Sequence, residues 1–161
     1  MSTLVGSYLG QYRVLREIGR GGMAAVYLAE QPSLGRYVAL KVLHPYLADD
    51  TTFVTRFQRE ARTAARLQHP NIVIIYEVGQ QGRYYFIAME YLPGQPLNKV
   101  ILRLGALPLR RATHIVSQVA AALDYAHSQG FVHRDIKPSN IIVGQGDSVK
   151  LTDFGIAKSR L

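Results

Sequence analysis

The sequence of 161 residues contains no cysteine. This absence excludes disulfide scaffolds, thiol nucleophiles and cysteine-ligated zinc sites. No apolar run approaches the roughly 20 residues that a helix needs to cross a bilayer, because candidates such as residues 72–76 and 116–123 are short or carry polar side chains. The N-terminus also lacks the basic and then apolar pattern of a secretory signal. We therefore expect a cytoplasmic location. The alternative is a membrane anchor in a C-terminal part of the protein that lies beyond this sequence.

Motifs of several other functional classes are missing too. No Gly-Lys-Ser or Gly-Lys-Thr follows a glycine-rich stretch, so there is no Walker-type phosphate loop, and no serine lies in the strand-turn-helix elbow of a Ser-His-Asp hydrolase. The formal net charge is +8, but the basic residues are scattered and form no stripe interleaved with aromatic residues. We therefore favour a solvated basic surface and expect no nucleic-acid partner. Four histidines show no metal-ligand spacing, so packing or surface roles are expected for His44, His69, His114 and His127.

What is present indicates a folded α+β protein. The hydrophobic fraction of 48% is ordinary for a globular protein and argues against disorder. Strand-like runs dominate the first 92 residues, and helical spacing dominates the next 40. Strands are predicted at 12–19, 24–31, 36–43, 72–78, 83–91, 141–143 and 149–152, and helices at 51–68, 97–104 and 109–128.

Cap and turn residues mark the ends of these elements. Asp50 or Thr51 is suited to cap the first helix, and Gly130 is suited to end the last one. A hairpin turn is predicted at 79–82. The long helix should bury one apolar stripe, formed by Ile115, Val116, Val119, Ala122, Leu123 and Ala126.

The segment Pro93-Gly94-Gln95-Pro96 is the strongest linker candidate, because glycine and paired prolines interrupt both strands and helices. It separates the strand-rich part of the chain from the helical part. The predicted organisation is an N-terminal extension at 1–11, a β-rich lobe with one helix at 12–92, a hinge at 93–96, and the start of a helical lobe at 97–161.

A glycine-rich stretch at 19–26 lies between the first two predicted strands. Glycines let backbone N–H groups approach a phosphate that any Cβ would hold away, although the same residues could simply form a hairpin turn. A dinucleotide-binding fingerprint would need a helix after the glycines, and the residues from Val26 onward read as a strand. The stretch is therefore a candidate phosphate site of another kind.

Lys41 interrupts an otherwise apolar strand, so its ammonium group should begin in a covered place, where it is costly unless paired. The alternative is an edge position with the amine reaching outward. Glu60 lies on the helix face that should point inward, and an inward glutamate near Lys41 could orient the lysine onto a phosphate. Taken alone, Glu60 would be an ordinary solvated helix residue.

The densest chemistry lies at residues 133–140 and 153–155. Asp135 follows the long helix in a loop, where a carboxylate can accept the proton of a substrate hydroxyl, and Lys137 can offset charge on a transferred phosphoryl group. Asn140 and Asp153 flank the last predicted hairpin and can supply oxygen ligands to one Mg²⁺-sized site. Each residue has a structural alternative as a cap, a turn or a strand exit, but this combination and spacing are specific.

Together these residues match the signature set of protein kinases, namely glycine loop, strand lysine, helix glutamate, catalytic loop and Asp-Phe-Gly. From about Tyr12 to Lys158 the chain resembles the bacterial eukaryotic-like (Hanks-type) serine/threonine protein kinases. The position of Lys137 after the aspartate is similar to the serine/threonine class. The resemblance implies a protein-kinase-like α+β fold, with a β-rich N-lobe carrying one helix and the beginning of a helical C-lobe.

The resemblance also implies ATP and Mg²⁺, or alternatively Mn²⁺, as cofactors. It makes Asp135 the catalytic base, with Lys137, Lys41 and Glu60 as further catalytic residues and Asn140 and Asp153 as metal ligands. Arg134 would grip a phosphorylated activation loop, and Ala64, Ile75, His133 and Phe154 would form a stack of side chains. The nucleotide would contact Ile18, Gly19, Gly21, Gly22, Val26, Ala39, Lys41, Met89 as gatekeeper, Glu90 and Leu92 in the hinge, and Ile142.

The function implied by this resemblance is transfer of the ATP γ-phosphoryl group to serine or threonine hydroxyls of proteins. In the family, Asp-Phe-Gly is followed by an activation segment, an Ala-Pro-Glu-like motif and further helices that this sequence lacks, and the start at Met1 suggests that only a C-terminal part is missing. The alternative is therefore a non-catalytic ATP-binding or interaction module derived from a kinase. Without those helices, exposed apolar side chains are expected on 109–128 and the catalytic loop. Because related kinases often dimerise through the N-lobe, a dimer of that kind is a further expectation.

Overall fold

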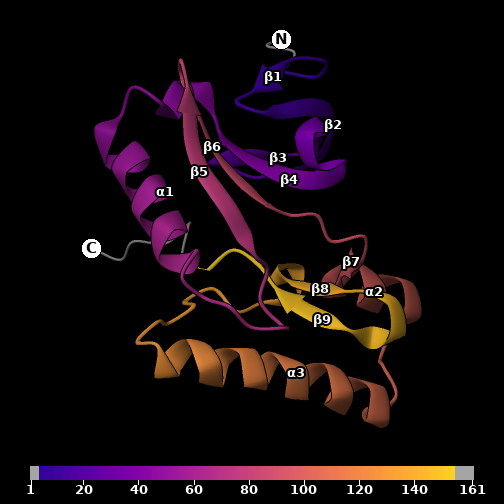
Figure 1. The fold of residues 1–161 in the computed structure, drawn as a ribbon. Helices are drawn as coiled ribbons and strands as arrows, with labels where there is room; N and C mark the ends of the chain where they lie inside the picture. Colours follow the sequence, from indigo (N-terminus) through magenta and orange to yellow (C-terminus); the bar gives the residue numbers. More distant parts are fainter. Residues whose placement is uncertain (1–3, 155–161) are drawn as a thin grey trace. The chain divides into compact units, whose positions relative to one another are not determined.

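The computed structural model describes residues 4–154, which form two compact units (Figure 1). Among the described residues, unit 1 consists of 4–65 and 74–91, and unit 2 consists of 66–73 and 92–154. The predicted Gly155 of Asp-Phe-Gly and the predicted start of an activation segment at 156–161 lie outside the described residues. So do the first three residues of the predicted N-terminal extension.

Unit 1 is built on one antiparallel sheet of six strands in the order β1-β2-β3-β4-β6-β5. The strands follow the runs of β-branched and aromatic residues that favour extended structure. Two short 3₁₀ turns, η1 (Pro32–Leu34) and η2 (Pro45–Leu47), connect parts of this unit. The strands are β1 (Tyr8–Leu9), β2 (Tyr12–Arg20), β3 (Ala24–Gln31), β4 (Arg36–Leu43), β5 (Ile75–Gln81) and β6 (Tyr84–Glu90).

The two faces of this sheet have different roles. Successive side chains of a strand point to opposite faces, and one face carries a buried core that includes Tyr12, Tyr27, Leu40 and Phe86. The rings of Tyr12 and Phe86 form a T-shaped contact with centroids 6.1 Å apart. The alternation in β4 therefore places Lys41 on the face opposite this core.

The helix α1 (Thr51–Ala64) packs against β5 and β6 (Figure 1). Asp50 caps it as predicted, since its carboxylate accepts a hydrogen bond of 2.9 Å from the N–H of Thr52. The predicted end of this helix at residue 68 is wrong. The helix stops four residues earlier because residues 66–73 belong to unit 2, where the N–H of Gln68 donates to the hydroxyl of Tyr125 at 3.0 Å.

The β5–β6 hairpin also differs from the prediction. Strand β5 begins at Ile75 rather than residue 72, and the turn is Gly82-Arg83 rather than 79–82, since Gln81 pairs with Tyr84. Gly79 is a strand residue opposite Phe86. A Cβ at this position would lie 2.9 Å from two ring carbons of Phe86. The glycine therefore provides room for a core side chain and does not form the turn.

Unit 2 combines two helices with a small antiparallel sheet of order β7-β8-β9. The predicted apolar stripe of α3 is buried at four positions, Ile115, Val119, Ala122 and Ala126, but Val116 is 62% exposed. Two 3₁₀ turns, η3 (Pro138–Asn140) and η4 (Gln145–Asp147), flank β8. The other elements are β7 (Gln95–Pro96), β8 (Ile141–Val143), β9 (Val149–Leu151), α2 (Leu97–Leu104) and α3 (Leu109–Ser128).

A polar network joins α3 to the small sheet. Gln118 donates to the carbonyl of Asp147 at 2.8 Å and accepts from the N–H of Val149 at 3.0 Å. Asn71 donates to the carbonyl of Val149 at 2.8 Å, and Arg111 makes two bonds to the carboxylate of Asp147 at 2.8 and 2.9 Å. These bonds hold the β8–β9 hairpin, whose two ends carry the candidate metal ligands.

Apolar side chains are exposed on α3 and in the catalytic loop, as expected, and include Leu109, Val116 and Ile136, which are 44–84% exposed. Leu102 of α2, at 87%, and Val132, at 56%, are exposed outside the segments of that expectation. No helix among residues 4–154 is both long and apolar enough to span a membrane.

Candidate active site

The glycine-rich stretch of unit 1 forms the turn between β2 and β3. Gly19 pairs with Val26 across the two strands, and the N–H of Gly21 donates to the carbonyl of Ala24 at 2.8 Å. The stretch is thus a hairpin turn, which was one of the two predicted readings. A phosphate-binding role is compatible with this geometry, because the turn keeps several backbone N–H groups at its tip.

Four predicted site residues share the sheet face opposite the core of unit 1. Val26 of β3 is directly opposite Lys41 of β4, and Ala39 of β4 is directly opposite Met89 of β6. Because their neighbours in each strand belong to the core cluster, the pleat turns all four side chains to the other face. The sheet therefore assembles a small apolar surface around the partly buried Lys41.

The predicted pairing of Lys41 with Glu60 stays a prediction. Glu60 lies on α1 and is partly buried, with its side chain 24% exposed, and its Oε1 is 3.4 Å from Nε of Arg56 one turn earlier. Ile18 lies beside an irregularity in the pairing of β2 and is 37% exposed. The N–H of Glu90 donates to the carbonyl of Ile74 at 2.8 Å.

Leu92 and Ile142 belong to unit 2, so the residues predicted to contact a nucleotide are divided between the two units. Ile142 lies in β8, opposite Pro96 of β7 and Lys150 of β9. Their roles toward a nucleotide remain predictions.

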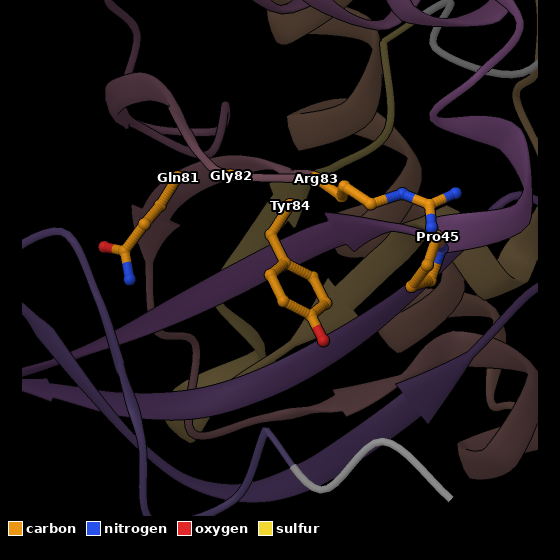
Figure 2. A pocket seen from close by; sticks show the side chains of 5 residues that line it. All are labelled: Pro45, Gln81, Gly82, Arg83 and Tyr84. Atoms are coloured by element: carbon orange, nitrogen blue, oxygen red, sulfur yellow. The ribbon is translucent and has the colours of Figure 1, made fainter.

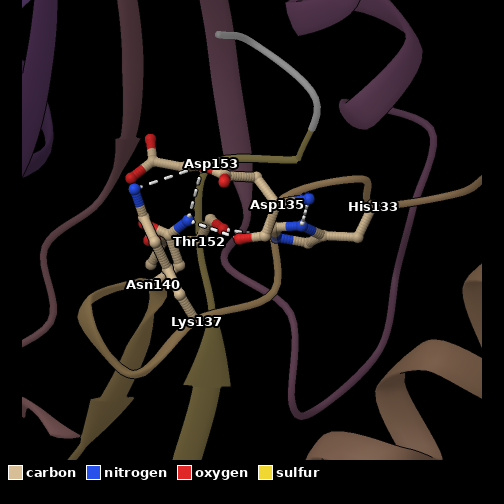
Figure 3. Close-up of polar contacts among 6 residues, drawn as sticks. All are labelled: His133, Asp135, Lys137, Asn140, Thr152 and Asp153. Carbon is tan, nitrogen blue, oxygen red and sulfur yellow. Dashed lines mark hydrogen bonds and ion pairs between the residues drawn. The ribbon is translucent and has the colours of Figure 1, made fainter. Parts of the chain in front are cut away.

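The loop after α3 brings three predicted residues together in unit 2 (Figure 3). Oδ2 of Asp135 is 3.2 Å from Nδ2 of Asn140 and 3.5 Å from Nζ of Lys137. Nδ2 of Asn140 also donates to the backbone carbonyl of Asp135 at 2.8 Å. The carboxylate of Asp135 is 11% exposed, whereas Lys137 is 52% exposed. One carboxylate oxygen is thus held by an amide and a cation, which sets the orientation of the group.

His133 is a structural centre of this loop. Its Nδ1 accepts from the N–H of Asp135 at 3.1 Å, so its Nε2 must carry the proton that is donated to the carbonyl of Thr152 at 2.8 Å. The ring is 1% exposed and packs on Phe154 with centroids 4.5 Å apart. Burial lowers the pKa of His133 below its usual value of 6.5. The neutral ring therefore joins the loop to the end of β9, while Asp135 remains the candidate base.

The candidate metal ligands lie at the two ends of the β8–β9 hairpin. The N–H of Thr152, the residue before Asp153, donates to the backbone carbonyl of Asn140 at 3.0 Å, which brings the two ends together. The carbonyl of Asp135 can only accept, so the amide of Asn140 must place Nδ2 there and leave Oδ1 as its oxygen ligand. Asp153 has a φ of +58°, a left-handed conformation that is uncommon outside glycine and often marks functional sites. An amide oxygen and a carboxylate suit Mg²⁺.

Residues 4–154 contain no cluster of three or more histidine or acidic side chains able to hold a metal ion. The donors supplied by Asn140 and Asp153 would therefore need further oxygen ligands. Mg²⁺ is commonly bound by one or two carboxylates together with substrate phosphates and water. The residues present fit a metal that arrives with a phosphorylated ligand.

The protonation of His133 predicts a pH dependence of stability. Because its pKa is lowered in the folded state, the unfolded chain binds more protons than the native chain as pH falls below about 6.5. Stability from this group is therefore complete above about pH 6.5 and is lost as pH decreases toward the lowered pKa. Thermal unfolding between pH 7.5 and 5.5 should show this loss, and His133→Gln should show a flatter profile. Equal slopes for the two proteins would contradict this assignment.

Two residues near the glycine turn had no predicted role in the site. Nε2 of His44 is 2.7 Å from the carbonyl of Gly21, and the hydroxyl of Tyr46 donates to the carbonyl of Gly22 at 2.8 Å. A packing or surface role was expected for His44, and it is indeed buried, at 8% exposure. Its polar contact could not be read from spacing, because the chain brings it back to the turn from 23 residues away.

A separate pocket in unit 1 contains none of the predicted site residues (Figure 2). It has a volume of about 450 Å³ and lies at the β5–β6 turn, next to η2. Its lining consists of Pro45, Gln81, Gly82, Arg83 and Tyr84. Arg83 is paired there with Asp49 at 2.6 Å, so its charge is already compensated.

Comparison with known proteins gives a consistent result. Residues 12–160 match the protein kinase domain family. The chain is 48% identical over 148 residues to the serine/threonine-protein kinase PrkC of Bacillus subtilis, covering 92% of this chain and 23% of that protein. It is 46% identical over 165 residues to the serine/threonine-protein kinase PknA of Mycobacterium tuberculosis, covering 99% of this chain and 38% of that protein. The chain thus spans well under half the length of these relatives.

Solved structures agree with these relatives. The kinase domain of Mycobacterium tuberculosis PknI is 42% identical, with a TM-score of 0.82, and the match covers 95% of this chain and 63% of that one. A mutant form of the same domain gives a TM-score of 0.84 at 40% identity, covering 98% of this chain and 64% of that one.

Proposed function

The chain belongs to the protein kinase domain family, and on this premise we propose that the protein containing it transfers the γ-phosphoryl group of ATP to serine or threonine hydroxyls of proteins. The observation that carries the proposal is the loop at 133–140, where Asn140 and Lys137 hold one oxygen of Asp135. The names of the relatives PrkC and PknA support the serine/threonine class.

In the proposed reaction, the hydroxyl oxygen of the substrate forms a bond to the γ-phosphorus as the bond to the β–γ bridging oxygen breaks and ADP leaves. The proton of the hydroxyl passes to the carboxylate of Asp135. The exposed ammonium of Lys137 lies beside this carboxylate and can offset charge on the phosphoryl group. His133 keeps Asp135 in place by accepting its backbone N–H, and takes no proton from the substrate.

Asn140 and Asp153 are the proposed holders of Mg²⁺, or alternatively Mn²⁺. A bound divalent ion would neutralise charge on the phosphates of the nucleotide. The role of the chain is to present oxygen ligands, and the bond from Asn140 to the carbonyl of Asp135 fixes the amide in the orientation that does so. On the other unit, Lys41 and the turn at 19–26 are proposed to contact the phosphates.

The proposal is tested by two measurements on one preparation of the 161-residue chain. MgATP should raise the midpoint of thermal unfolding, because a ligand that binds only the native state stabilises it. Radiolabel from ATP labelled with ³²P at the γ position should appear on a generic basic protein containing serine and threonine. Absence of both effects would contradict the proposal.

A non-catalytic ATP-binding or interaction module is the second candidate. It concerns the 161-residue chain by itself, which covers 61–64% of the solved kinase domains of PknI. Stabilisation by MgATP without transfer of label would support this candidate over the first.

We also propose that unit 1 mediates dimerisation. The support is the exposure of apolar side chains on this unit, including Leu34 at 62% and Tyr37 at 59%. Sedimentation equilibrium would test it, and a monomer mass maintained at high micromolar concentration would contradict it.

A further inference from the structure

The segment that follows β4 reaches back to the tip of the glycine turn. His44 is the first residue after β4 and Tyr46 lies in η2. Three consecutive carbonyls of the turn accept hydrogen bonds from this segment: Gly21 from Nε2 of His44 at 2.7 Å, Gly22 from the hydroxyl of Tyr46 at 2.8 Å, and Met23 from the backbone N–H of His44 at 2.8 Å. The turn is thus held on one side by a run of only three residues.

In each of these bonds the turn supplies the acceptor and the segment after β4 supplies the donor. A backbone carbonyl can only accept, so Nε2 of His44 carries a proton and donates it. The rings of His44 and Tyr46 are stacked, with centroids 5.3 Å apart and planes 15° apart. His44 is buried, whereas Tyr46 is 69% exposed. An exposed tyrosine whose hydroxyl and ring are both engaged is held in one orientation.

These bonds also orient the opposite side of the turn. In a planar trans peptide the C=O and the N–H point in opposite directions. Fixing the carbonyls of Gly21 and Gly22 toward His44 and Tyr46 therefore turns the N–H groups of Gly22 and Met23 away from them. Within residues 4–154 these two N–H groups donate to no other residue. The turn consequently presents two N–H donors on the side opposite the His44–Tyr46 contact.

The segment is itself anchored at both ends. The same strand, β4, carries Lys41 three residues before His44, and the same connection ends at Asp50, the cap of α1. The connection has its own hydrogen bonds, from the N–H of Leu47 to the carbonyl of His44 at 2.9 Å and from the N–H of Asp50 to the carbonyl of Leu47 at 3.2 Å. Its geometry is therefore fixed relative to β4.

We propose that His44 and Tyr46 are positioning residues for phosphate binding, which hold the glycine turn so that the N–H groups of Gly22 and Met23 are aimed at the phosphates of the nucleotide. The inference rests on the proposed function, because it assigns residues to the same ATP site. It predicts that changing either side chain weakens the binding of ligands that carry phosphates and leaves the binding of the nucleoside alone unchanged.

The test compares MgATP with adenosine by isothermal titration calorimetry on the 161-residue chain. Tyr46→Phe removes one hydroxyl donor. His44→Phe removes the Nε2 donor and keeps a flat ring against Tyr46. Each should raise the dissociation constant for MgATP about fivefold, the ordinary effect of losing one neutral hydrogen bond. The dissociation constant for adenosine should not change.

Two control variants separate the hydrogen bonds from packing. His44→Gln keeps an N–H donor within reach of Gly21 and loses the ring, so it should bind MgATP like the wild type. Tyr8→Phe removes the hydroxyl of another exposed tyrosine, which lies on β1 away from the turn, and should have no effect. Thermal unfolding midpoints of all variants provide the measure of folding.

The outcomes distinguish the positioning role from the proposed function. Unchanged MgATP affinity in Tyr46→Phe and His44→Phe, with a wild type that binds MgATP, would overturn the positioning role alone. An equal loss of affinity for MgATP and adenosine would also overturn it, because the damage would not concern the phosphates. A wild-type chain that binds neither ligand would overturn the proposed function and the positioning role together.

Discussion

Asp135→Asn should lower the rate of phosphoryl transfer about 10²–10⁴-fold, the range expected when a general base is lost. Asparagine has nearly the same shape but accepts no proton at neutral pH, so binding of MgATP should change little. In the wild type, Oδ2 of Asp135 is 3.2 Å from Nδ2 of Asn140 and 3.5 Å from Nζ of Lys137. The substitution replaces this carboxylate with a neutral amide. Incorporation of radiolabel into a basic protein measures the rate, and calorimetry measures nucleotide binding.

Lys41→Met should abolish transfer through a different step, because it removes the cation proposed to contact the phosphates. It should weaken MgATP binding, whereas Asp135→Asn should not. Asp124→Asn, a substitution on α3 outside the candidate site, serves as the matched control for the first variant. Activity that survives both Asp135→Asn and Lys41→Met would overturn the assignment of roles.

Gly94→Ala should cost about 1–3 kcal/mol of stability, the usual effect of forcing an extra methyl group into a packed site. An added Cβ would lie 2.8 Å from the carbonyl carbon of Val143 and 3.0 Å from the backbone nitrogen of Gly144, as well as against the carbonyl oxygen of Val143. These are backbone atoms of the β8 end and cannot rotate away. The pairing of Gln95 with Val143 should therefore be disrupted.

Urea unfolding monitored by circular dichroism would measure this effect. Gly22→Ala is the control for stability, since its added Cβ would meet no atom within 4 Å and its backbone does not require glycine. The control should be neutral or slightly stabilising. A Gly94→Ala protein as stable as the wild type would show that β7 is not needed to hold β8.

The elements whose boundaries depend on local signals could be predicted closely. Strands 24–31 and 36–43 and helices 97–104 and 109–128 occur at the predicted residues. Their ends coincide with residues that act locally, such as Gly35 and Gly105, both of which have positive φ. Local conformational preference is readable from sequence because it does not depend on distant partners.

The errors arose where a distant partner decides the conformation. Gly79 resembles a turn residue, but the ring of Phe86 across the hairpin requires a position without a Cβ. Residues 65–68 continue the helical spacing of α1. The N–H of Gln68, however, donates a hydrogen bond to the hydroxyl of Tyr125, which lies 57 residues away in the sequence. None of these partners is visible in a local window.

The candidate site shows the same division. The types and spacing of Asp135, Lys137 and Asn140 predicted that they act together, and the structure brings them into contact. The roles of these residues toward ATP and metal stay predictions. The contact of His44 with the glycine turn was not predicted, because an isolated histidine carries no spacing signal and the contact depends on where β4 ends relative to that turn.

The assignment of residues 66–73 to unit 2 has a consequence for how the chain can acquire its structure. Asn71 must meet Val149, 78 positions later, before the hairpin that carries Asn140 and Asp153 is complete. During synthesis residues 66–73 emerge before the β5–β6 hairpin. They cannot form their contacts in unit 2 until the later residues, such as Val149, have been synthesised. All of unit 1 has been synthesised once the chain reaches Tyr91. Ribosome-bound intermediates should therefore contain an ordered first unit while the catalytic loop is still unformed.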